Sequence, residues 1–208
     1  MTVFDTVPMA ALADWRRQIN DLYAEIRLMN NPVAAWMHWQ KTRSLLFKHH
    51  DMSPILAEKR SEFNKIKLFS YDPALRFFVT LHPLASVASA VDLGEDNVIR
   101  YKSVAKTCGL EETLGSELTV FWISGYGGGL FIPFQDASNS ETTFGGGRYI
   151  IDAIKGADLG TDQENRLILD FNFSYNPSCA MNEAYVCPLS PPENQFPTAI
   201  NVGEKWDP

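Results

Sequence analysis

The stretch KIKLFSYDPALRFFVTL, residues 65–81, marks the place where the chain changes from a helical to a strand-like pattern. Before it, apolar residues recur at steps of three and four, as in amphipathic helices. Within it, Tyr71-Asp72-Pro73 is typical of a turn, and Leu75–Leu81 is rich in β-branched and aromatic residues. We therefore predict that a helical N-terminal part ends here and that a β-rich body begins.

On the N-terminal side, the pattern predicts two long helices and a short one. The first has a continuous apolar face, formed by Leu12, Trp15, Ile19, Leu22, Ile26 and Met29. Asn31-Pro32 supplies an N-cap and a proline for the first turn of a second helix, which we expect to run to about Lys48. The same signal at Ser53-Pro54 predicts a third helix over residues 53–63.

On the C-terminal side, strand candidates follow one another at short intervals, with no helical pattern between most of them. They are Ser86–Val91, Asn97–Ala105, Glu117–Ile123, Gly129–Phe134, Arg148–Ala153, Arg166–Phe171 and Phe196–Val202. This succession favours an antiparallel β-barrel or packed β-sandwich over a parallel sheet. We predict one mainly β (α+β) domain over residues 1–208, in which the helical segment 1–63 packs on a β-rich body, 65–208.

The composition limits the class of partner. The chain has 208 residues, 45% hydrophobic and 21% charged, with a formal net charge of -7. An acidic protein is repelled by nucleic-acid phosphates and by anionic membranes, so we expect neither as a partner. No apolar run of about 18 residues and no secretory signal sequence is present, which favours the cytoplasm.

Three cysteines, Cys108, Cys179 and Cys187, lack the CxxC or CxxH spacing of metal and redox motifs. All four histidines lie at or before position 82. We therefore predict no metal site and reduced, buried, inert thiols. Pairing of Cys179 with Cys187, or joint metal binding by the two, stays the alternative.

The run Phe144-Gly-Gly-Gly-Arg-Tyr149 is the strongest local signal for a binding site. Three glycines allow backbone amides to point together at an anion, and Arg148 could add a bidentate contact. The alternative is a turn entering a strand, with Arg148 in a structural ion pair. The run lacks the spacing of nucleotide-binding loops, so those classes are disfavoured.

Two polar stretches and an irregular segment complete the candidate site. Asp136 lies in a polar stretch just before the glycine run. On a strand, Asp170, Asn172 and Ser174 would share one face, either lining a barrel mouth or facing water. Residues 175–197 are proline-rich, and we expect them to form an ordered loop over the barrel, as a lid or a pocket wall.

Residues 127–160 (GGGLFIPFQDASNSETTFGGGRYIIDAIKGADLG) and 167–206 (LILDFNFSYNPSCAMNEAYVCPLSPPENQFPTAINVGEKW) resemble the family catalogued as domain of unknown function 1684. The resemblance extends over about Trp39–Trp206 and implies no established reaction. It implies a shared pocket, because many residues that match the family's motifs are polar or glycine rather than apolar. This sequence departs from the family in an apparent extra loop, Lys106–Gly115, and in the charges at Lys65–Lys67.

The leading hypothesis is a cofactor-free enzyme, of hydrolase or isomerase type, acting on a polar or anionic small molecule. The predicted catalytic residues are Asp170, Asp136 and Tyr175. The predicted substrate-binding residues are Gly145, Gly146, Gly147, Arg148, Tyr149, Asn172, Asn176 and Glu204. A flavin-binding barrel and a non-catalytic interaction module are the alternatives, and a homodimer stays open.

Overall fold

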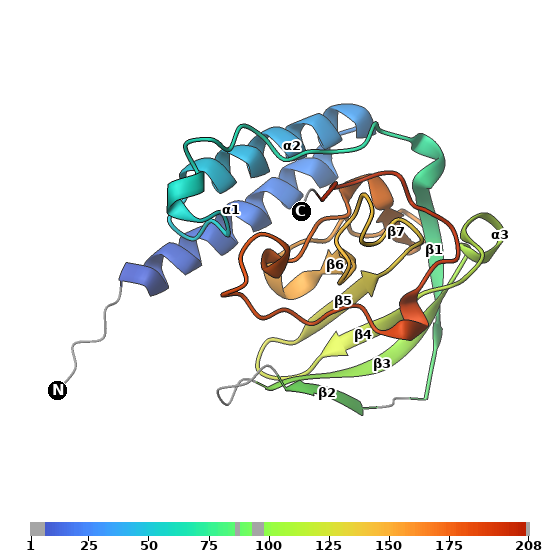
Figure 1. Cartoon of the computed structure of the whole chain (residues 1–208). Helices are drawn as coiled ribbons and strands as arrows, with labels where there is room; N and C mark the ends of the chain where they lie inside the picture. Colours follow the sequence, from blue (N-terminus) through green and yellow to red (C-terminus); the bar gives the residue numbers. More distant parts are fainter. Residues whose placement is uncertain (1–6, 86–87, 93–97, 207–208) are drawn as a thin grey trace.

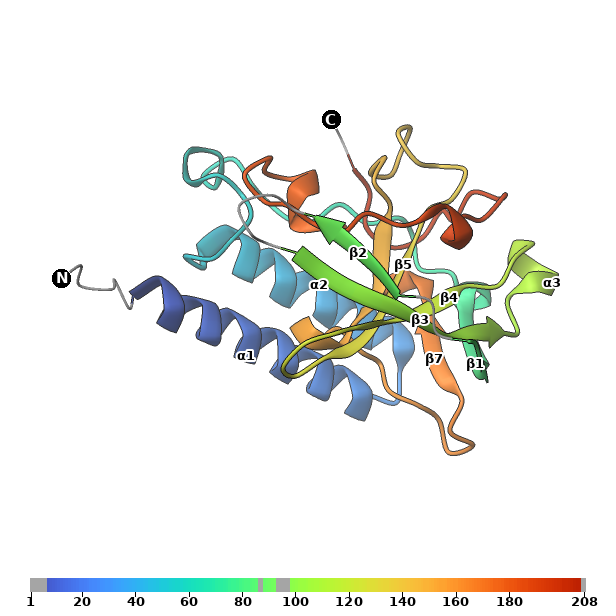
Figure 2. The same ribbon diagram turned by 90° about the horizontal axis from the view of Figure 1, so that it is seen from below.

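The computed structural model describes the whole chain except residues 1–6, 86–87, 93–97 and 207–208. Its first elements, α1 (Val7–Leu28) and α2 (Pro32–His49), confirm the two long predicted helices. Asn31 caps α2, because its side-chain oxygen accepts a hydrogen bond from the Ala34 amide. Figures 1 and 2 show the two helices side by side along one side of the β-rich body.

The third predicted helix, over residues 53–63, is wrong. This segment contains only a single 3-10 turn, η1 (Ala57–Lys59). The Ser53 hydroxyl donates to the Phe47 carbonyl and accepts from the Ile55 amide, which holds the chain in a turn against the end of α2. A local side-chain hydrogen bond therefore competes successfully with helix formation.

Seven strands form one antiparallel sheet in the order β6-β5-β4-β3-β1-β7, with β2 paired to β3. The strands are β1 (Arg76–Pro83), β2 (Ala88–Asp92), β3 (Val98–Cys108), β4 (Thr119–Ile123), β5 (Gly129–Phe134), β6 (Arg148–Asp152) and β7 (Leu167–Asp170). The sheet curves into a nearly closed barrel, which confirms the predicted antiparallel barrel with N-terminal helices.

Short helical turns lie before, between and after the strands. They are η2 (Pro73–Leu75), α3 (Glu111–Leu114), η3 (Ala153–Lys155), η4 (Phe171–Phe173), η5 (Ser178–Ala180) and η6 (Pro192–Asn194). The predicted extra loop, Lys106–Gly115, is wrong in its first part, because β3 continues to Cys108. Only α3 and its flanking residues form the connection to β4.

Two strand predictions near the C-terminus are also wrong. Residues 196–202 form no strand, and two of their carbonyls, at Ile200 and Val202, accept hydrogen bonds from a buried arginine side chain instead. The predicted alternation of Asp170, Asn172 and Ser174 along one strand fails because β7 ends at Asp170. The chain then turns through η4, where all three side chains are buried.

The helices share one apolar cluster with residues of the sheet such as Tyr101, Phe121 and Phe131. The Trp39 ring of α2 packs edge-on against Phe173, with ring centroids 5.5 Å apart. The Trp39 indole also donates a hydrogen bond to the Tyr23 hydroxyl of α1. A second apolar cluster, which includes Val79, Ile132 and Leu169, fills the space between the strands. Among the described residues, no helix combines the length and the hydropathy that a membrane span requires.

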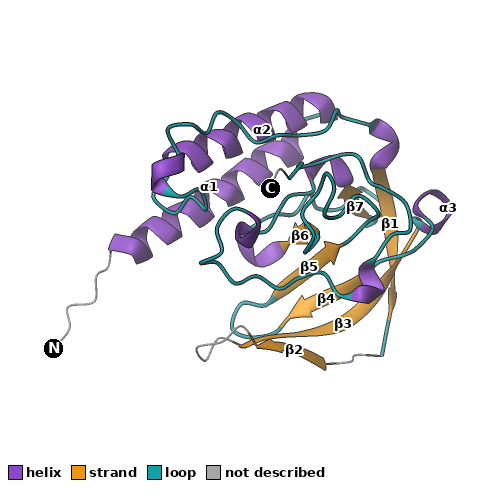
Figure 3. Ribbon diagram, viewed as in Figure 1, coloured by secondary structure: helices purple, strands orange, loops and turns teal. Residues whose placement is uncertain are grey.

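The C-terminal segment, residues 175–206, lies as mostly irregular chain along the body, as Figures 1 and 3 show. Single bridges join it to the sheet region, between Tyr149 and Tyr175 and between Gln135 and Gln195. The segment is therefore ordered by contacts to distant parts of the chain, although it has little regular structure of its own.

Candidate functional site

Arg148 and Asp136 form an ion pair inside the protein. The pairing of β5 with β6 brings them together, since Arg148 begins β6 and Asp136 follows the end of β5. Arg148 Nη2 lies 2.8 Å from Asp136 Oδ2, and neither side chain is exposed beyond 1%. The guanidinium also donates to the carbonyls of Val202 and Ile200. Burial lowers the pKa of Arg148 in spite of the nearby carboxylate.

The remaining acceptor of Asp136 is occupied as well. Its Oδ1 accepts hydrogen bonds from the amide and hydroxyl of Ser138 and from the Ile200 amide. Both oxygens of the carboxylate and both terminal nitrogens of the guanidinium are therefore satisfied by partners within the described part of the chain, and only Arg148 Nε lacks one. This geometry matches the structural interpretation of the Gly-Gly-Gly-Arg run, in which Arg148 ties β6 to the C-terminal segment.

Glu204 forms a second buried ion pair, with Arg43 of α2. Arg43 Nη2 lies 2.6 Å from Glu204 Oε1, while Glu204 Oε2 accepts a hydrogen bond from the Asn176 amide. The Arg43 guanidinium lies 4.9 Å from the centroid of the Tyr175 ring. Burial alone would lower the pKa of Arg43, but the Glu204 carboxylate, together with Tyr23 and Tyr175, outweighs burial and raises that pKa. This pair attaches α2 to the C-terminal segment.

Tyr149, which follows Arg148 in β6, forms a bridge with Tyr175 of the C-terminal segment. Their backbones exchange two hydrogen bonds, and their ring centroids are 5.8 Å apart at an angle of 81°. The Tyr149 hydroxyl donates to the Pro188 carbonyl. Burial raises the pKa of both tyrosines above the ordinary value. Both phenols are therefore weaker acids than an exposed tyrosine, and both stay protonated at neutral pH.

Several polar atoms of this region have unused hydrogen-bonding capacity. Among the described residues, four buried side-chain atoms have no hydrogen-bond partner: Trp36 Nε1, Arg148 Nε, Tyr175 Oη and Asn176 Oδ1. Three of them belong to residues that the sequence predicts in the site. Buried polar atoms without partners are rare, and each calls for a physical reason.

Asp170 and Asn172 lie in a separate cluster. Asp170 Oδ2 is 2.9 Å from Arg76 Nη1, and its other oxygen accepts hydrogen bonds from Asn172. The Asn172 side chain also exchanges hydrogen bonds with the backbone of Asp72. Burial raises the pKa of Asp170, against the hydrogen bonds from Asn172 and Arg76. The cluster makes no hydrogen bond to the Arg148–Asp136 pair, so the predicted carboxylates do not converge on one point.

The glycine run forms a tight turn before β6. Gly147 has a φ of 88° and its amide donates to the Phe144 carbonyl. A Cβ at Gly147 would lie 2.5 Å from the Phe134 carbonyl oxygen, and one at Gly146 would overlap the Phe144 ring. Close packing therefore explains why these positions carry glycine.

Asn194 is a buried polar residue to which sequence reasoning assigned no role beyond its match to the family motif. Its amide nitrogen donates to the carbonyls of Thr119 and Pro133, and its oxygen accepts from the Thr119 amide. It thus connects β4 and β5 to the C-terminal segment. No local pattern identifies this role, because the partners of the Asn194 side chain are all more than sixty positions away.

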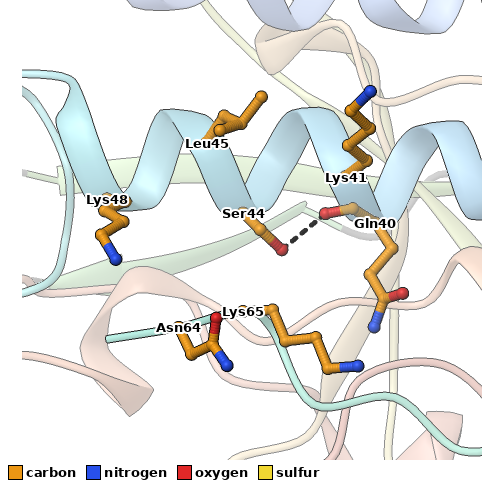
Figure 4. Close-up of a pocket in the computed structure, with 7 residues that line it drawn as sticks. All are labelled: Gln40, Lys41, Ser44, Leu45, Lys48, Asn64 and Lys65. Atoms are coloured by element: carbon orange, nitrogen blue, oxygen red, sulfur yellow. Dashed lines mark hydrogen bonds between the residues drawn. The ribbon is translucent and has the colours of Figure 1, made fainter. Parts of the chain in front are cut away.

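The structure contains a pocket that sequence reasoning did not assign, which we name the α2 pocket (Figure 4). It has a volume of about 270 Å³ and is lined by Gln40, Lys41, Ser44, Leu45, Lys48, Asn64 and Lys65. Gln40 and Ser44 of α2 form hydrogen bonds with the backbone of Ile66. These bonds attach the segment that carries Asn64 and Lys65 to the helix. The only sequence signal was Lys65, one of the charged departures from the family pattern.

The prediction of three buried thiols is wrong. Cys108 is exposed at the end of β3, and Cys179 and Cys187 are half-buried in the C-terminal segment. All three cysteines are free thiols, so Cys179 and Cys187 form no disulfide. No group of three or more His, Cys, Asp or Glu residues with metal-binding geometry occurs in the described part of the chain.

Comparisons with known proteins place the chain in a family without assigning an activity. The solution NMR structure of an uncharacterized protein from Haloarcula marismortui matches with a TM-score of 0.57 and 26% sequence identity, over 85% of this chain and 97% of that one. No curated protein matches the chain. The family model described as "Protein of unknown function (DUF1684)" matches residues 61–205. The chain therefore belongs to the DUF1684 family.

Proposed function

We propose that the protein binds a small anionic molecule in the α2 pocket. The observation that carries this proposal is the charge of the lining, which includes Lys41, Lys48 and Lys65 and no carboxylate. None of these lysines forms an ion pair with any residue of the described ranges. Such a local positive field on a protein of net charge -7 attracts carboxylates and phosphates selectively.

The arrangement of the side chains indicates how an anion would be held. Lys48 lies on the side of α2 that faces Asn64 and Lys65, whereas Lys41 lies on the opposite side of the helix in the view of Figure 4. Lys48 and Lys65 would make direct contacts, and Lys41 would add to the field at the rim. A volume of about 270 Å³ suits a ligand of a few heavy atoms, such as phosphate or a small di- or tricarboxylate.

This proposal keeps the ligand class that the sequence predicts but moves the site. The Ser44 hydroxyl donates to the Gln40 carbonyl and accepts from the Ile66 amide, so it is already engaged as a structural group. The geometry of the pocket thus supports binding more directly than hydrolysis or isomerisation. We place the protein in the cytoplasm, where small anionic metabolites are abundant, and propose no bound cofactor.

The test is isothermal titration calorimetry and thermal shift with inorganic phosphate, citrate and AMP at low ionic strength. The triple variant Lys41→Gln, Lys48→Gln, Lys65→Gln should lose the binding heat and the rise in Tm. The control triple variant carries Lys59→Gln, Lys102→Gln and Lys106→Gln, which change net charge equally at exposed lysines outside the pocket. It should keep both signals, and added salt should weaken them.

Equal loss of binding in both triple variants would show a non-specific charge effect and would contradict the proposal. Absence of binding by the wild type to all three anions would do the same. A visible absorbance spectrum of the same sample tests the flavin alternative. Light scattering after size-exclusion chromatography tests the homodimer.

A further inference from the structure

A second pocket lies where the turn between α1 and α2 meets the sheet, and we name it the arginine pocket. It is enclosed by the end of α1, the start of α2, Arg76 of β1, Leu159, Ile168 of β7 and Phe173 of η4. Its volume is about 90 Å³, against about 270 Å³ for the α2 pocket, and the two pockets share no lining residue. The arginine pocket is therefore a separate site that admits a ligand of only a few heavy atoms.

Arg27 and Arg76 line this pocket from two different elements, and each is held in place through one nitrogen. Arg27 Nη1 donates to the Asp158 carbonyl over 2.6 Å, and Arg76 Nη1 lies 2.9 Å from Asp170 Oδ2. Neither guanidinium makes another hydrogen bond within the described part of the chain. Both therefore keep N–H groups for a ligand, and a planar guanidinium matches the geometry of a carboxylate.

The charges around the arginine pocket leave a positive excess. The buried Asp170 carboxylate balances Arg76, whereas Arg27 forms no ion pair with any residue that the structure describes. The lining contains no carboxylate among the described residues. Pro32 and Ala35 belong to the first turn of α2, so the positive end of that helix dipole also faces the pocket. An anion that enters is therefore attracted, and no acidic side chain of the lining repels it.

The rest of the lining is largely apolar, which decides between two kinds of anion. Ile26, Ala35, Leu159 and Phe173 are buried side chains of the lining, and Ile168 is half-buried. Phosphate carries oxygens on all sides, so that some of them would face these apolar groups without a hydrogen-bond donor. A carboxylate carries its charge at one end only, and its alkyl end gains from contact with an apolar wall. The lining thus favours a short-chain carboxylate over a tetrahedral oxyanion.

We propose that the arginine pocket binds a short-chain monocarboxylate. Arg27 and Arg76 hold the carboxylate, and the alkyl end contacts Ile168 and Phe173. The Asn30 side chain lines the same pocket, and its amide can donate a further hydrogen bond. This inference goes beyond anion binding in the α2 pocket and does not depend on it, because the lysines of that pocket lie outside this lining.

The test is a titration of the ¹⁵N-labelled full-length protein with sodium propionate, followed by NMR spectroscopy. Sodium chloride keeps the ionic strength constant, so that the shifts report binding rather than screening. We expect saturable shift changes at the amides of residues 26–35 and 168 and at the Arg27 side chain. NMR is the suitable method because so small a ligand binds weakly.

Arg27→Gln should weaken propionate binding by about tenfold, because it removes one charge-assisted contact to the carboxylate. The matched control is Arg16→Gln, which removes the same charge from an exposed position of α1 outside the pocket and should bind like the wild type. Arg76→Lys leaves a cation beside Asp170, so the fold should survive by circular dichroism. It should still weaken binding, because an ammonium lacks the planar fork. The triple lysine variant of the α2 pocket should bind propionate like the wild type.

Several results would overturn the proposal. One is the absence of saturable shift changes around the arginine pocket of the wild type. Another is equal weakening by Arg16→Gln and Arg27→Gln, since the effect would then be one of overall charge. Phosphate that saturates the same shifts at a lower concentration than propionate would exclude selection by the apolar lining. Shift changes confined to residues 41–48 and 64–65, and lost in the triple lysine variant, would place propionate in the α2 pocket. That last result would contradict this inference and support the proposed function.

Discussion

The guanidinium of Arg148 lies 2.8 Å from the carboxylate of Asp136, and both groups are enclosed within the protein. This ion pair joins the start of β6 to the stretch that follows β5, and Arg148 also binds the carbonyls of Ile200 and Val202. The residue that the sequence marks most strongly as a ligand contact therefore anchors the C-terminal segment.

Arg148→Ala should destabilise the protein by about 3–5 kcal/mol, because it leaves the Asp136 carboxylate buried without its partner. Urea unfolding followed by circular dichroism measures the change. The control is Arg166→Ala, which removes a partly exposed partner of Asp162 and should cost less than about 1 kcal/mol. If the Arg148→Ala protein is as stable as the wild type, Arg148 is not a structural anchor. That result would favour the sequence-based prediction that Arg148 contacts a ligand.

Gly147→Ala should be more destabilising than Gly127→Ala, although both glycines have similar positive φ angles, 88° and 81°. The left-handed conformation costs each alanine about 1–2 kcal/mol. Only at Gly147 does the new Cβ also meet a backbone oxygen, 2.5 Å away, whereas nothing lies within 4 Å at Gly127. Thermal unfolding of the two variants isolates this steric contribution, and equal Tm values would show that the turn before β6 is not tightly packed.

Tyr175→Phe should leave the free energy of unfolding unchanged or raise it by about 1 kcal/mol, because the buried Tyr175 hydroxyl has no partner among the described residues. Tyr149→Phe is the matched control, and it should destabilise by about 1 kcal/mol through loss of the hydrogen bond to Pro188. If Tyr175→Phe instead lowers the free energy of unfolding more than Tyr149→Phe does, the Tyr175 hydroxyl has a bound partner in the native protein. That outcome would support the predicted catalytic role of Tyr175.

Glu117→Gln should destabilise the protein by roughly 1–2 kcal/mol near neutral pH, and by less in acid. Burial alone would raise the pKa of Glu117, but hydrogen bonds from Thr107 and the amides of residues 109–111 outweigh it and lower that pKa. A lowered folded-state pKa stabilises the fold fully above the ordinary value of 4.5. The contribution is lost as the pH falls through the folded-state pKa.

Unfolding free energies of the wild type and of Glu117→Gln, measured from pH 7 to pH 3, should therefore converge in acid. Glu112→Gln is the control, because the exposed Glu112 side chain makes no hydrogen bond to a described residue. A difference between wild type and Glu117→Gln that stays constant across this range would show that the carboxylate charge does not matter there.

Local patterns were sufficient to predict the architecture. The capping pair Asn31-Pro32 begins α2, and the predicted strand Gly129–Phe134 coincides with β5. These elements depend on backbone propensity, capping and the alternation of apolar residues, all of which are properties of neighbouring positions. Where the same signals failed, as at Ser53-Pro54, one side-chain hydrogen bond to the end of α2 replaced the expected helix.

The sequence by itself also determined which positions carry unusual polar residues, and Asp136, Arg148 and Glu204 are indeed polar groups in a buried environment. Only the tertiary structure decided what these groups do, because their partners lie far away in the chain. Glu204 pairs with Arg43 from α2, and the Asn194 side chain binds the backbone of Thr119 and Pro133 in the sheet. The pKa and the reactivity of a buried group depend on the groups that the fold places within hydrogen-bonding distance. The periodicity of residues along the chain does not determine which distant groups come that close.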